Sequence, residues 1–260
     1  MSTKGTKEWC ERNCNLVQGC KYGCRYCYAR WMSHRFGRID WDDWTVAWET
    51  TPIQNIELRK CSGRVLIAST HDVFPEIEER YLEAMEIHLK KGNSLLMVSK
   101  PYLKAIKTIC ETLESYRKQI MFRFTITSNN NEILTHWEPF APLYKERKEA
   151  LLYAHNVDFQ TSISCEPYLK TPVQLYNELE EYVTDTFWIG PMNYYFYTSP
   201  REDPLARENL KEYTRMCAQE KERLTELYDP TYIKHIAQET KHFPKIKYKD
   251  HFLNKLHKTI

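Results

Sequence analysis

The chain has 260 residues, a formal net charge of +2 and 28% charged residues. It is therefore long enough to bury a large core, and it is not a bulk polyelectrolyte binder. Residues 1–11 lack the apolar run of a secretory leader, and no run of roughly 18 apolar residues could span a bilayer. With nine cysteines, this pattern indicates a reducing compartment and thiols available for metal. We expect a cytoplasmic protein that does not bind membranes.

Three cysteines near the start of the chain, Cys20, Cys24 and Cys27, have C-x3-C-x2-C spacing. We expect a short strand over residues 15–18 to lead into this loop and a helix over residues 28–35 to follow it. Three thiolates on one short loop can hold three irons of a [4Fe–4S] cluster and leave the fourth iron open to a substrate or cofactor. A zinc site with a remote fourth ligand is the alternative. Zinc sites usually show paired C-x2-C elements or a trailing His pair, and neither is present.

The next segment, residues 36–49, is rich in Trp and acidic residues and predicts an excursion or lid. Strands and helices then alternate at intervals of roughly 30 residues, which favours parallel β/α units. The predicted strands are 65–69, 95–99, 120–127, 157–164 and 186–189, and the predicted helices are 75–91, 102–116, 142–155, 171–183 and 201–228, the last capped by Asp203 or a nearby residue.

With the strand at 15–18, the predicted sheet has six strands, too few for a closed eight-stranded barrel. We therefore predict an α/β fold, a partial (β/α)6 barrel with a C-terminal helical and basic extension. The predicted division is an N-terminal segment (1–13), the barrel core (14–200) and a C-terminal helix with a basic tail (201–260).

Polar residues follow most of the predicted strands. Ligands of β/α folds bind at the carboxyl ends of the strands, so these residues are the candidate site. Beyond the three cysteines, they are Ser69, Thr70, His71, Asp72, Lys100, Thr125, Thr127, Cys165, Glu166 and Gly190. Each polar one could instead cap the helix that follows it.

The string QGCKYGCRYCYAR over residues 18–30, with Tyr26 just before the last cysteine, is similar to the signature of radical S-adenosylmethionine enzymes. It resembles in particular the spore photoproduct lyase-like branch, also described as DNA repair photolyases. Looser matches lie at residues 68–76, 98–100, 124–127, Glu138-Pro139 and Arg147, so the resemblance extends from about residue 14 to 193. It implies a [4Fe–4S] cluster on the three cysteines, S-adenosyl-L-methionine as cofactor, and an external electron donor of the flavodoxin or ferredoxin kind.

The residues at the strand ends suit this cofactor. Asp72 could pair with its ammonium group, and Lys100 or a hydroxyl of Ser69 or Thr70 with its carboxylate. Its ribose hydroxyls could bond to Thr125, Thr127 or Glu166, its adenine could approach the backbone at Gly190, and Tyr26 offers an aromatic face. His71 is either a general acid–base group or an ordinary loop residue.

Ser69 is a departure from the resemblance. It stands where we align the hydrogen-donor cysteine of spore photoproduct lyases, and a Ser O–H bond is too strong to replace that donor. Cys165 is an alternative donor, although a buried structural thiol is the simpler interpretation. Cys10 and Cys14 form a further C-x3-C pair that could help to hold an auxiliary cluster.

We therefore predict an enzyme that cleaves S-adenosylmethionine reductively to a 5′-deoxyadenosyl radical, which abstracts hydrogen from a substrate. By analogy, a nucleobase in DNA is the favoured substrate, and the reaction is a repair, rearrangement or modification of lyase or isomerase type. A peptide, amino acid or small metabolite stays open as substrate, as does a non-catalytic zinc-stabilised module that binds nucleic acid. The tail over residues 231–260 has seven lysines against two acidic residues, so it either follows a phosphate backbone or is a solvated extension.

Overall fold

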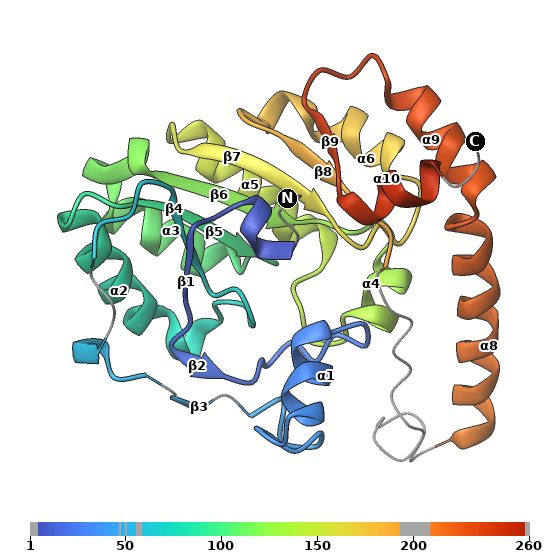
Figure 1. The fold of residues 1–260 in the computed structure, drawn as a ribbon, viewed down its shortest axis with the longest axis horizontal. Helices are drawn as coiled ribbons and strands as arrows, with labels where there is room; N and C mark the ends of the chain where they lie inside the picture. Colours follow the sequence, from blue (N-terminus) through green and yellow to red (C-terminus); the bar gives the residue numbers. More distant parts are fainter. Residues whose placement is uncertain (1–4, 47, 50, 56–58, 193–208, 258–260) are drawn as a thin grey trace.

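A seven-stranded sheet is the centre of the fold in this computed structural model, which describes residues 5–46, 48–49, 51–55, 59–192 and 209–257 (Figure 1). The strand order is β1-β4-β5-β6-β7-β8-β9, and every neighbouring pair is parallel. β1 and β9 are the two edges, so the sheet stays open. The strands are β1 (Arg12–Cys14), β4 (Arg64–Ile67), β5 (Ser94–Ser99), β6 (Ile120–Thr125), β7 (Gln160–Cys165), β8 (Phe187–Ile189) and β9 (Ile246–Tyr248).

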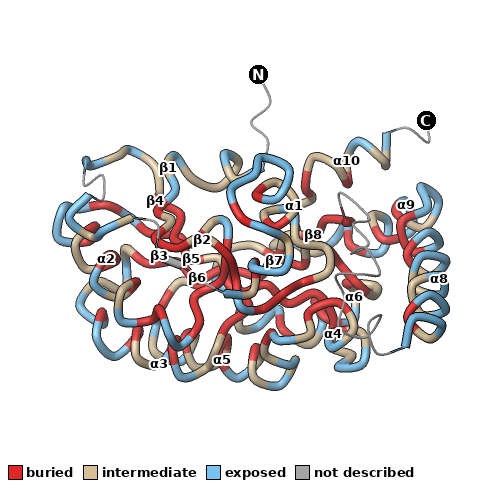
Figure 2. The backbone as a smooth tube through the Cα atoms, turned by 90° about the horizontal axis from the view of Figure 1, so that it is seen from below, coloured by how far each residue is buried: buried red, intermediate tan, exposed pale blue. Residues whose placement is uncertain are grey.

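Helices alternate with the strands, and α3 and α5 lie along one side of the sheet (Figure 2). The N-terminal turn η1 and helix α10 lie on the other side. The helices are α1 (Tyr28–Arg35), α2 (Glu78–Lys90), α3 (Leu103–Thr112), α4 (Asn131–Trp137), α5 (Tyr144–Asn156), α6 (Pro172–Leu179), α8 (Leu210–Leu227), α9 (Pro230–Thr240) and α10 (Asp250–His257), and the 3-10 turns are η1 (Gly5–Glu8), η2 (Ile53–Asn55), η3 (Pro75–Ile77), η4 (Glu114–Gln119) and η5 (Glu180–Tyr182).

Strands β4 and β5 carry apolar residues on both faces because both faces are covered, whereas β7 buries the hydroxyls of Thr161, Ser162 and Ser164. Val65 and Ile67 belong to the main core with the helices. Leu66 points the other way, into a smaller cluster with Leu96 and Met121 that packs against Trp9. The residues just after η1 therefore cover the inner face of the open sheet.

The structure confirms the predicted α/β class and the open, partial-barrel sheet. It also contains a seventh strand, β9, which the sequence did not predict because it lies in the basic tail. β1 and β9 belong to the sheet although they lie mainly in the segments predicted to flank the core. The predicted boundaries between the three segments stay a prediction.

The prediction of a sheet strand at residues 15–18 is wrong. The strand in the sheet is Arg12–Cys14, and β2 (Val17–Gln18) instead pairs antiparallel with β3 (Trp48–Glu49). The backbone leaves the sheet because the N–H of Leu16 donates to the Tyr81 hydroxyl at 2.8 Å rather than to a neighbouring strand.

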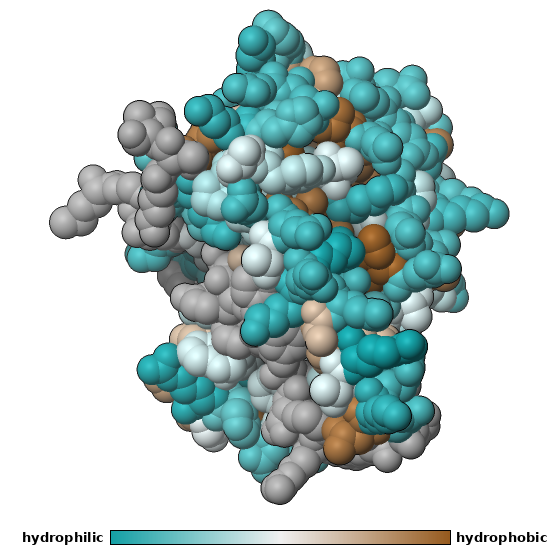
Figure 3. Space-filling model, turned by 90° about the vertical axis from the view of Figure 1, so that its right-hand side faces the viewer, coloured by the Kyte–Doolittle hydropathy of each residue, from teal (hydrophilic) through white to brown (hydrophobic). Residues whose placement is uncertain are grey.

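The helix predicted at residues 201–228 is observed as α8, capped by the Asn209 side chain, and the predicted cap Asp203 lies outside the described residues. The face that carries α8 and α9 is mostly hydrophilic (Figure 3). Among the described helices, none is both long and apolar enough to cross a membrane.

Candidate active site

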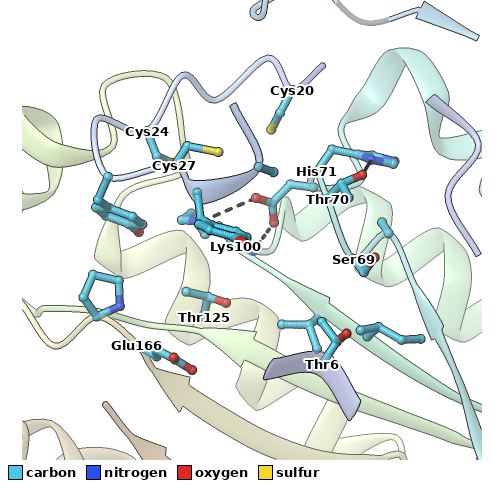
Figure 4. A pocket seen from close by; sticks show the side chains of 18 of the residues that line it. Thr6, Cys20, Cys24, Cys27, Ser69, Thr70, His71, Lys100, Thr125 and Glu166 are labelled. Atoms are coloured by element: carbon cyan, nitrogen blue, oxygen red, sulfur yellow. Dashed lines mark hydrogen bonds and ion pairs between the residues drawn. The ribbon is translucent and has the colours of Figure 1, made fainter. Parts of the chain in front are cut away.

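A cavity of about 320 Å³ lies at the carboxyl ends of the central strands (Figure 4). The residues predicted for the site meet there, with three exceptions described below. They are Cys20, Cys24, Tyr26, Cys27, Ser69, Thr70, His71, Asp72, Lys100, Thr125 and Glu166. The cavity is also lined by residues that were not predicted, among them Thr6, Trp9, Trp44 and Met192.

The cysteine loop has its shape because of two features of the backbone. Gly19 has φ +90°, and a Cβ there would lie 2.8 Å from the carbonyl oxygens of Trp44 and Val46, so only glycine fits. The N–H of Cys20 donates to the Trp44 carbonyl at 2.8 Å. The predicted excursion over residues 36–49 therefore packs directly against the loop and fixes the position of Cys20.

Cys27 begins helix α1. Its Sγ accepts a hydrogen bond from the backbone N–H of Arg30 at 3.4 Å, in the manner of an N-cap. The partial positive charge of a helix N-terminus stabilises a thiolate, so this position favours the ionised form needed for metal binding.

All three thiols are free, and burial raises the pKa of each, that of Cys20 to about 12. The ammonium of Lys100 opposes this effect at Cys24 and Cys27. Metal binding displaces the thiol protons, so the site favours loading with a strongly bound group over free thiolates.

The donor set fits an iron–sulfur cluster. Cys20, Cys24 and Cys27 all line one cavity, and thiolates are the ligands that such clusters use. A structural zinc ion takes four donors and would need a further ligand besides these three.

Asp72 and Lys100 form a buried ion pair beside the cysteines. Asp72 Oδ1 accepts from the Ser99 hydroxyl at 2.9 Å and the Lys100 backbone N–H at 2.5 Å, and Oδ2 lies 3.5 Å from Lys100 Nζ. Burial alone would lower the pKa of Lys100, but Asp72 and the neighbouring acidic groups outweigh it and the pKa is raised. Lys100 therefore stays charged in the cavity.

A second buried network supports Tyr26. The Tyr26 hydroxyl donates to Glu138, which also accepts from the Thr127 hydroxyl at 2.9 Å and pairs with Arg147. Burial alone would raise the pKa of Glu138, but Arg147 and Lys100 reverse this effect and lower it. Arg147 also donates to the Thr125 carbonyl at 3.2 Å. One ion pair thus joins the cysteine loop to the end of β6.

His71 also lines the cavity. Its Nε2 lies 2.5 Å from the Tyr81 hydroxyl, and its Nδ1 lies 3.0 Å from the Thr70 hydroxyl. The Tyr81 hydroxyl also accepts from the N–H of Leu16, so both ring nitrogens of His71 have a hydroxyl partner within one buried network. Burial lowers the pKa of His71 to about 4. His71 is thus a neutral, fully hydrogen-bonded ring.

Ser69 is held by one side chain. Its N–H donates to Asn15 Oδ1 at 2.7 Å, and its Oγ accepts from Asn15 Nδ2 at 2.9 Å. The preceding Ala68 has φ +57°, which turns the chain sharply at the end of β4. The hydroxyl of Ser69 therefore has a fixed position on the cavity wall.

Three of the predicted residues do not line the cavity. Thr127 bonds to Glu138 instead, and Cys165 is fully buried, with its pKa raised by burial. A Cβ on Gly190 would lie 2.9 Å from Lys249 Cγ and 3.1 Å from the His251 ring. Gly190 thus leaves room for the tail, and the roles predicted for these three residues stay predictions.

Sequence reasoning gave no role to the Glu138–Arg147 pair, although both residues were noted in the resemblance. It also missed Trp9 and Lys249, for which the sequence holds no local signal. Trp9 lines the cavity and Lys249 lies beside Glu166 because the two ends of the described chain meet there, with Lys249 Nζ 3.0 Å from Glu8 Oε1.

The open sheet, with a cavity lined by three cysteines at the ends of its strands, defines a partial-barrel protein. The chain has the fold of the spore photoproduct lyases. It aligns with one solved variant at a TM-score of 0.54 and 15% identity, and with another, holding a dinucleoside spore photoproduct, at 0.53 and 14%. Each alignment covers 90% of this chain and 74% of the other. The predicted resemblance is confirmed at the level of the fold.

An uncharacterized protein of Methanocaldococcus jannaschii is 28% identical to this chain over 156 residues. That alignment covers 58% of each protein, so the chain spans a little over half of this relative. No protein-family model matches the chain.

Proposed function

We propose that the protein is a radical S-adenosylmethionine enzyme that acts on a nucleobase in DNA. The observation that carries this proposal is the convergence of Cys20, Cys24 and Cys27 with the Asp72–Lys100 pair on one cavity. The three thiolates are soft ligands that suit an iron–sulfur cluster. The buried ion pair and the neighbouring hydroxyls suit the charged amino and carboxylate groups of S-adenosylmethionine.

The three cysteines would hold a [4Fe–4S] cluster, and S-adenosylmethionine would lie in the cavity beside it. When bound, the cluster supplies the electron for reductive cleavage of the cofactor to methionine and a 5′-deoxyadenosyl radical, which takes hydrogen from the substrate. An external flavodoxin- or ferredoxin-like protein would provide that electron.

The protein's own part is binding and exclusion of water. Lys100 offers a charged donor to the carboxylate of the cofactor, and Asp72 offers one oxygen to its ammonium group. Thr125 and Glu166 offer acceptors farther from the cysteines. Burial of Lys100 and Asp72, each less than 10% exposed, strengthens these contacts because little water competes for them.

The substrate class rests on the fold relative that holds a dinucleoside spore photoproduct. Ser69, fixed by Asn15, lies on the cavity wall at the position where we align the hydrogen-donor cysteine of spore photoproduct lyases, and Cys165 does not line the cavity. We therefore expect a reaction that needs no thiol donor at these positions, such as a base modification or rearrangement, rather than repair by hydrogen return from a cysteine.

The test is anaerobic reconstitution with iron and sulfide, followed by reduction and assay for 5′-deoxyadenosine. We expect a brown protein that forms 5′-deoxyadenosine, and loss of both properties in Cys24→Ala. The matched control is Cys110→Ala, because Cys110 is buried in α3 and does not line the cavity. A colourless wild-type protein with one zinc, or turnover by Cys24→Ala, would contradict the proposal. Deuterated oligonucleotides then test the substrate, since label must reach 5′-deoxyadenosine.

A further inference from the structure

Glu166 lies at the end of the cavity opposite the cysteines (Figure 4). It follows β7, and its side chain is 19% exposed. Its carboxylate receives no hydrogen bond from any residue that the structure describes. The nearest cationic atoms are His251 Nε2 at 3.8 Å from Oε1 and Lys249 Nζ at 4.0 Å from Oε2. Because this carboxylate lines the cavity and accepts no hydrogen bond from the described residues, its oxygens are available to a bound donor group.

Lys249 is fixed in place from several directions. Its backbone N–H donates to the Ile189 carbonyl at 3.0 Å, continuing the pairing of β9 with β8. Its Nζ lies 3.0 Å from Glu8 Oε1 and 4.2 Å from the centre of the Trp9 ring. The side chain is 5% exposed. Lys249 is thus a rigid, buried cation beside Glu166 rather than a solvated tail residue.

The other charged groups around Glu166 differ from Lys249. His251 Nε2 donates to the Pro191 carbonyl at 2.5 Å, and burial lowers the pKa of His251 to about 4, so the ring is neutral at physiological pH. Arg123 bonds to Ser162 and Asp185 through Nε and Nη2, and its Nη1 is buried without a hydrogen-bond partner. Glu8 adds a second negative charge, which lies 3.0 Å from Lys249 Nζ. Among the described cations that are charged at neutral pH, Lys249 is the one that lies within 4.0 Å of Glu166.

We infer that Glu166 accepts hydrogen bonds from a paired O–H or N–H donor group of the bound ligand, and that Lys249 is the positioning residue that keeps this carboxylate charged and oriented. The inference rests on the proposed function. Two groups bound in the cavity could supply these donors, namely the ribose diol of the cofactor and the N–H edge of a substrate base.

The charges around Glu166 support this arrangement and predict the direction in which ligand affinity changes with pH. Burial raises the pKa of Glu166 to about 7, Lys249 and Arg123 lower it, and Glu8 raises it. Because the ionised carboxylate is the better acceptor, ligand affinity should fall as the pH drops through this value. Removing Lys249 should move that midpoint to higher pH, and removing the charge of Glu8 should move it to lower pH.

The experiment measures affinity against pH by calorimetry on the anaerobically reconstituted protein, with S-adenosylhomocysteine and with a short DNA oligonucleotide as separate probes. Lys249→Met should raise the midpoint by about 1–3 pH units, the usual effect of losing a nearby opposite charge. Glu8→Gln should lower it, and Lys249→Arg should keep it near the wild-type value. Glu166→Gln should abolish the pH dependence. The control is Lys247→Met, because Lys247 is exposed on the same strand.

A midpoint that moves only for S-adenosylhomocysteine assigns the donor group to the ribose, and one that moves only for the oligonucleotide assigns it to the base. Equal loss of affinity in Lys249→Met and Glu8→Gln, without opposite pH displacements, would show a merely structural role and overturn the inference. So would the failure of wild-type protein to bind either probe. Binding with the expected displacements but no 5′-deoxyadenosine would instead refute the proposed function alone.

Discussion

Arg147→Met tests the buried ion pair that supports the cysteine loop. Neither the Arg147 nor the Glu138 side chain has exposed surface, and Arg147 also donates to the Pro142 carbonyl at 2.7 Å and the Thr125 carbonyl at 3.2 Å. The substitution leaves a buried carboxylate without its cation and two carbonyls without these donors. Breaking a buried pair from one side costs about 3–5 kcal/mol, and we expect the free energy of unfolding to fall by that amount near neutral pH.

The pH dependence of this loss follows from the pKa of Glu138. In the wild type that pKa is lowered, so the pair stabilises the fold above the pKa of the unfolded carboxyl and the gain is lost as pH falls through the folded value. Without Arg147, burial should raise the pKa of Glu138 above its unfolded value, and the folded state then loses stability as pH rises. The loss of unfolding free energy caused by Arg147→Met should therefore increase from roughly pH 5 to pH 8.

The assay is urea unfolding followed by circular dichroism across this pH range. Lys148→Met is the matched control on the same helix, because the Lys148–Glu178 pair is about one-third exposed and should contribute less than about 1 kcal/mol. Adding Glu138→Gln to Arg147→Met should recover part of the loss. A loss of unfolding free energy below about 1 kcal/mol in Arg147→Met, or a loss that is the same at every pH, would refute the reasoning.

The other predictions concern ligands. Lys100→Met should weaken binding of S-adenosylhomocysteine about tenfold or more by calorimetry, since it removes a buried charged donor, while Lys104→Met on the exposed side of α3 should not. His71→Gln should not alter the pH dependence of 5′-deoxyadenosine formation near pH 6.5, because the pKa of His71 is about 4. A rate change near pH 6.5 in the wild type that is lost in His71→Gln would contradict the neutral role of His71. If the tail follows phosphates, replacing the exposed Lys234 and Lys241 with Gln should lower the salt slope of DNA binding by about 2, and an unchanged slope would exclude this.

The fold was predictable where the sequence of a strand is by itself enough to indicate that strand. β5 and β6 are buried on both faces, so β5 contains a continuous apolar run over residues 95–98 and β6 is apolar over residues 120–124 except at Arg123. β9 has no such signal, because Ile246 and Tyr248 flank a lysine in a basic segment, and the strand conformation depends on pairing with β8. The error at residues 15–18 has a similar cause, since Leu16 is apolar and buried but bonds to a side chain from α2.

The candidate site was predictable to the same degree. The cysteine loop and the polar residues at strand ends are local patterns, and the structure brings most of them to one cavity. The partners of those residues are set by tertiary contacts. Nothing near Glu166 in the sequence indicates Lys249, and nothing near Tyr26 indicates that Glu138 accepts a hydrogen bond from its hydroxyl. Spacing therefore predicted which residues surround the cavity, but not which of their charges are already paired.

The contact between η1 and Lys249 also bears on how the protein is made. Lys249 Nζ lies 3.5 Å from the Gly5 carbonyl across 244 residues of sequence. At the usual rate of synthesis, roughly 5–20 residues per second, about 10–50 seconds separate the emergence of these two positions from the ribosome. The cysteine loop at 20–27 therefore leaves the ribosome well before β9 and Lys249 are available to pack beside η1 and Glu166. The end of the site opposite the cysteines is completed only after nearly the whole described chain has been made.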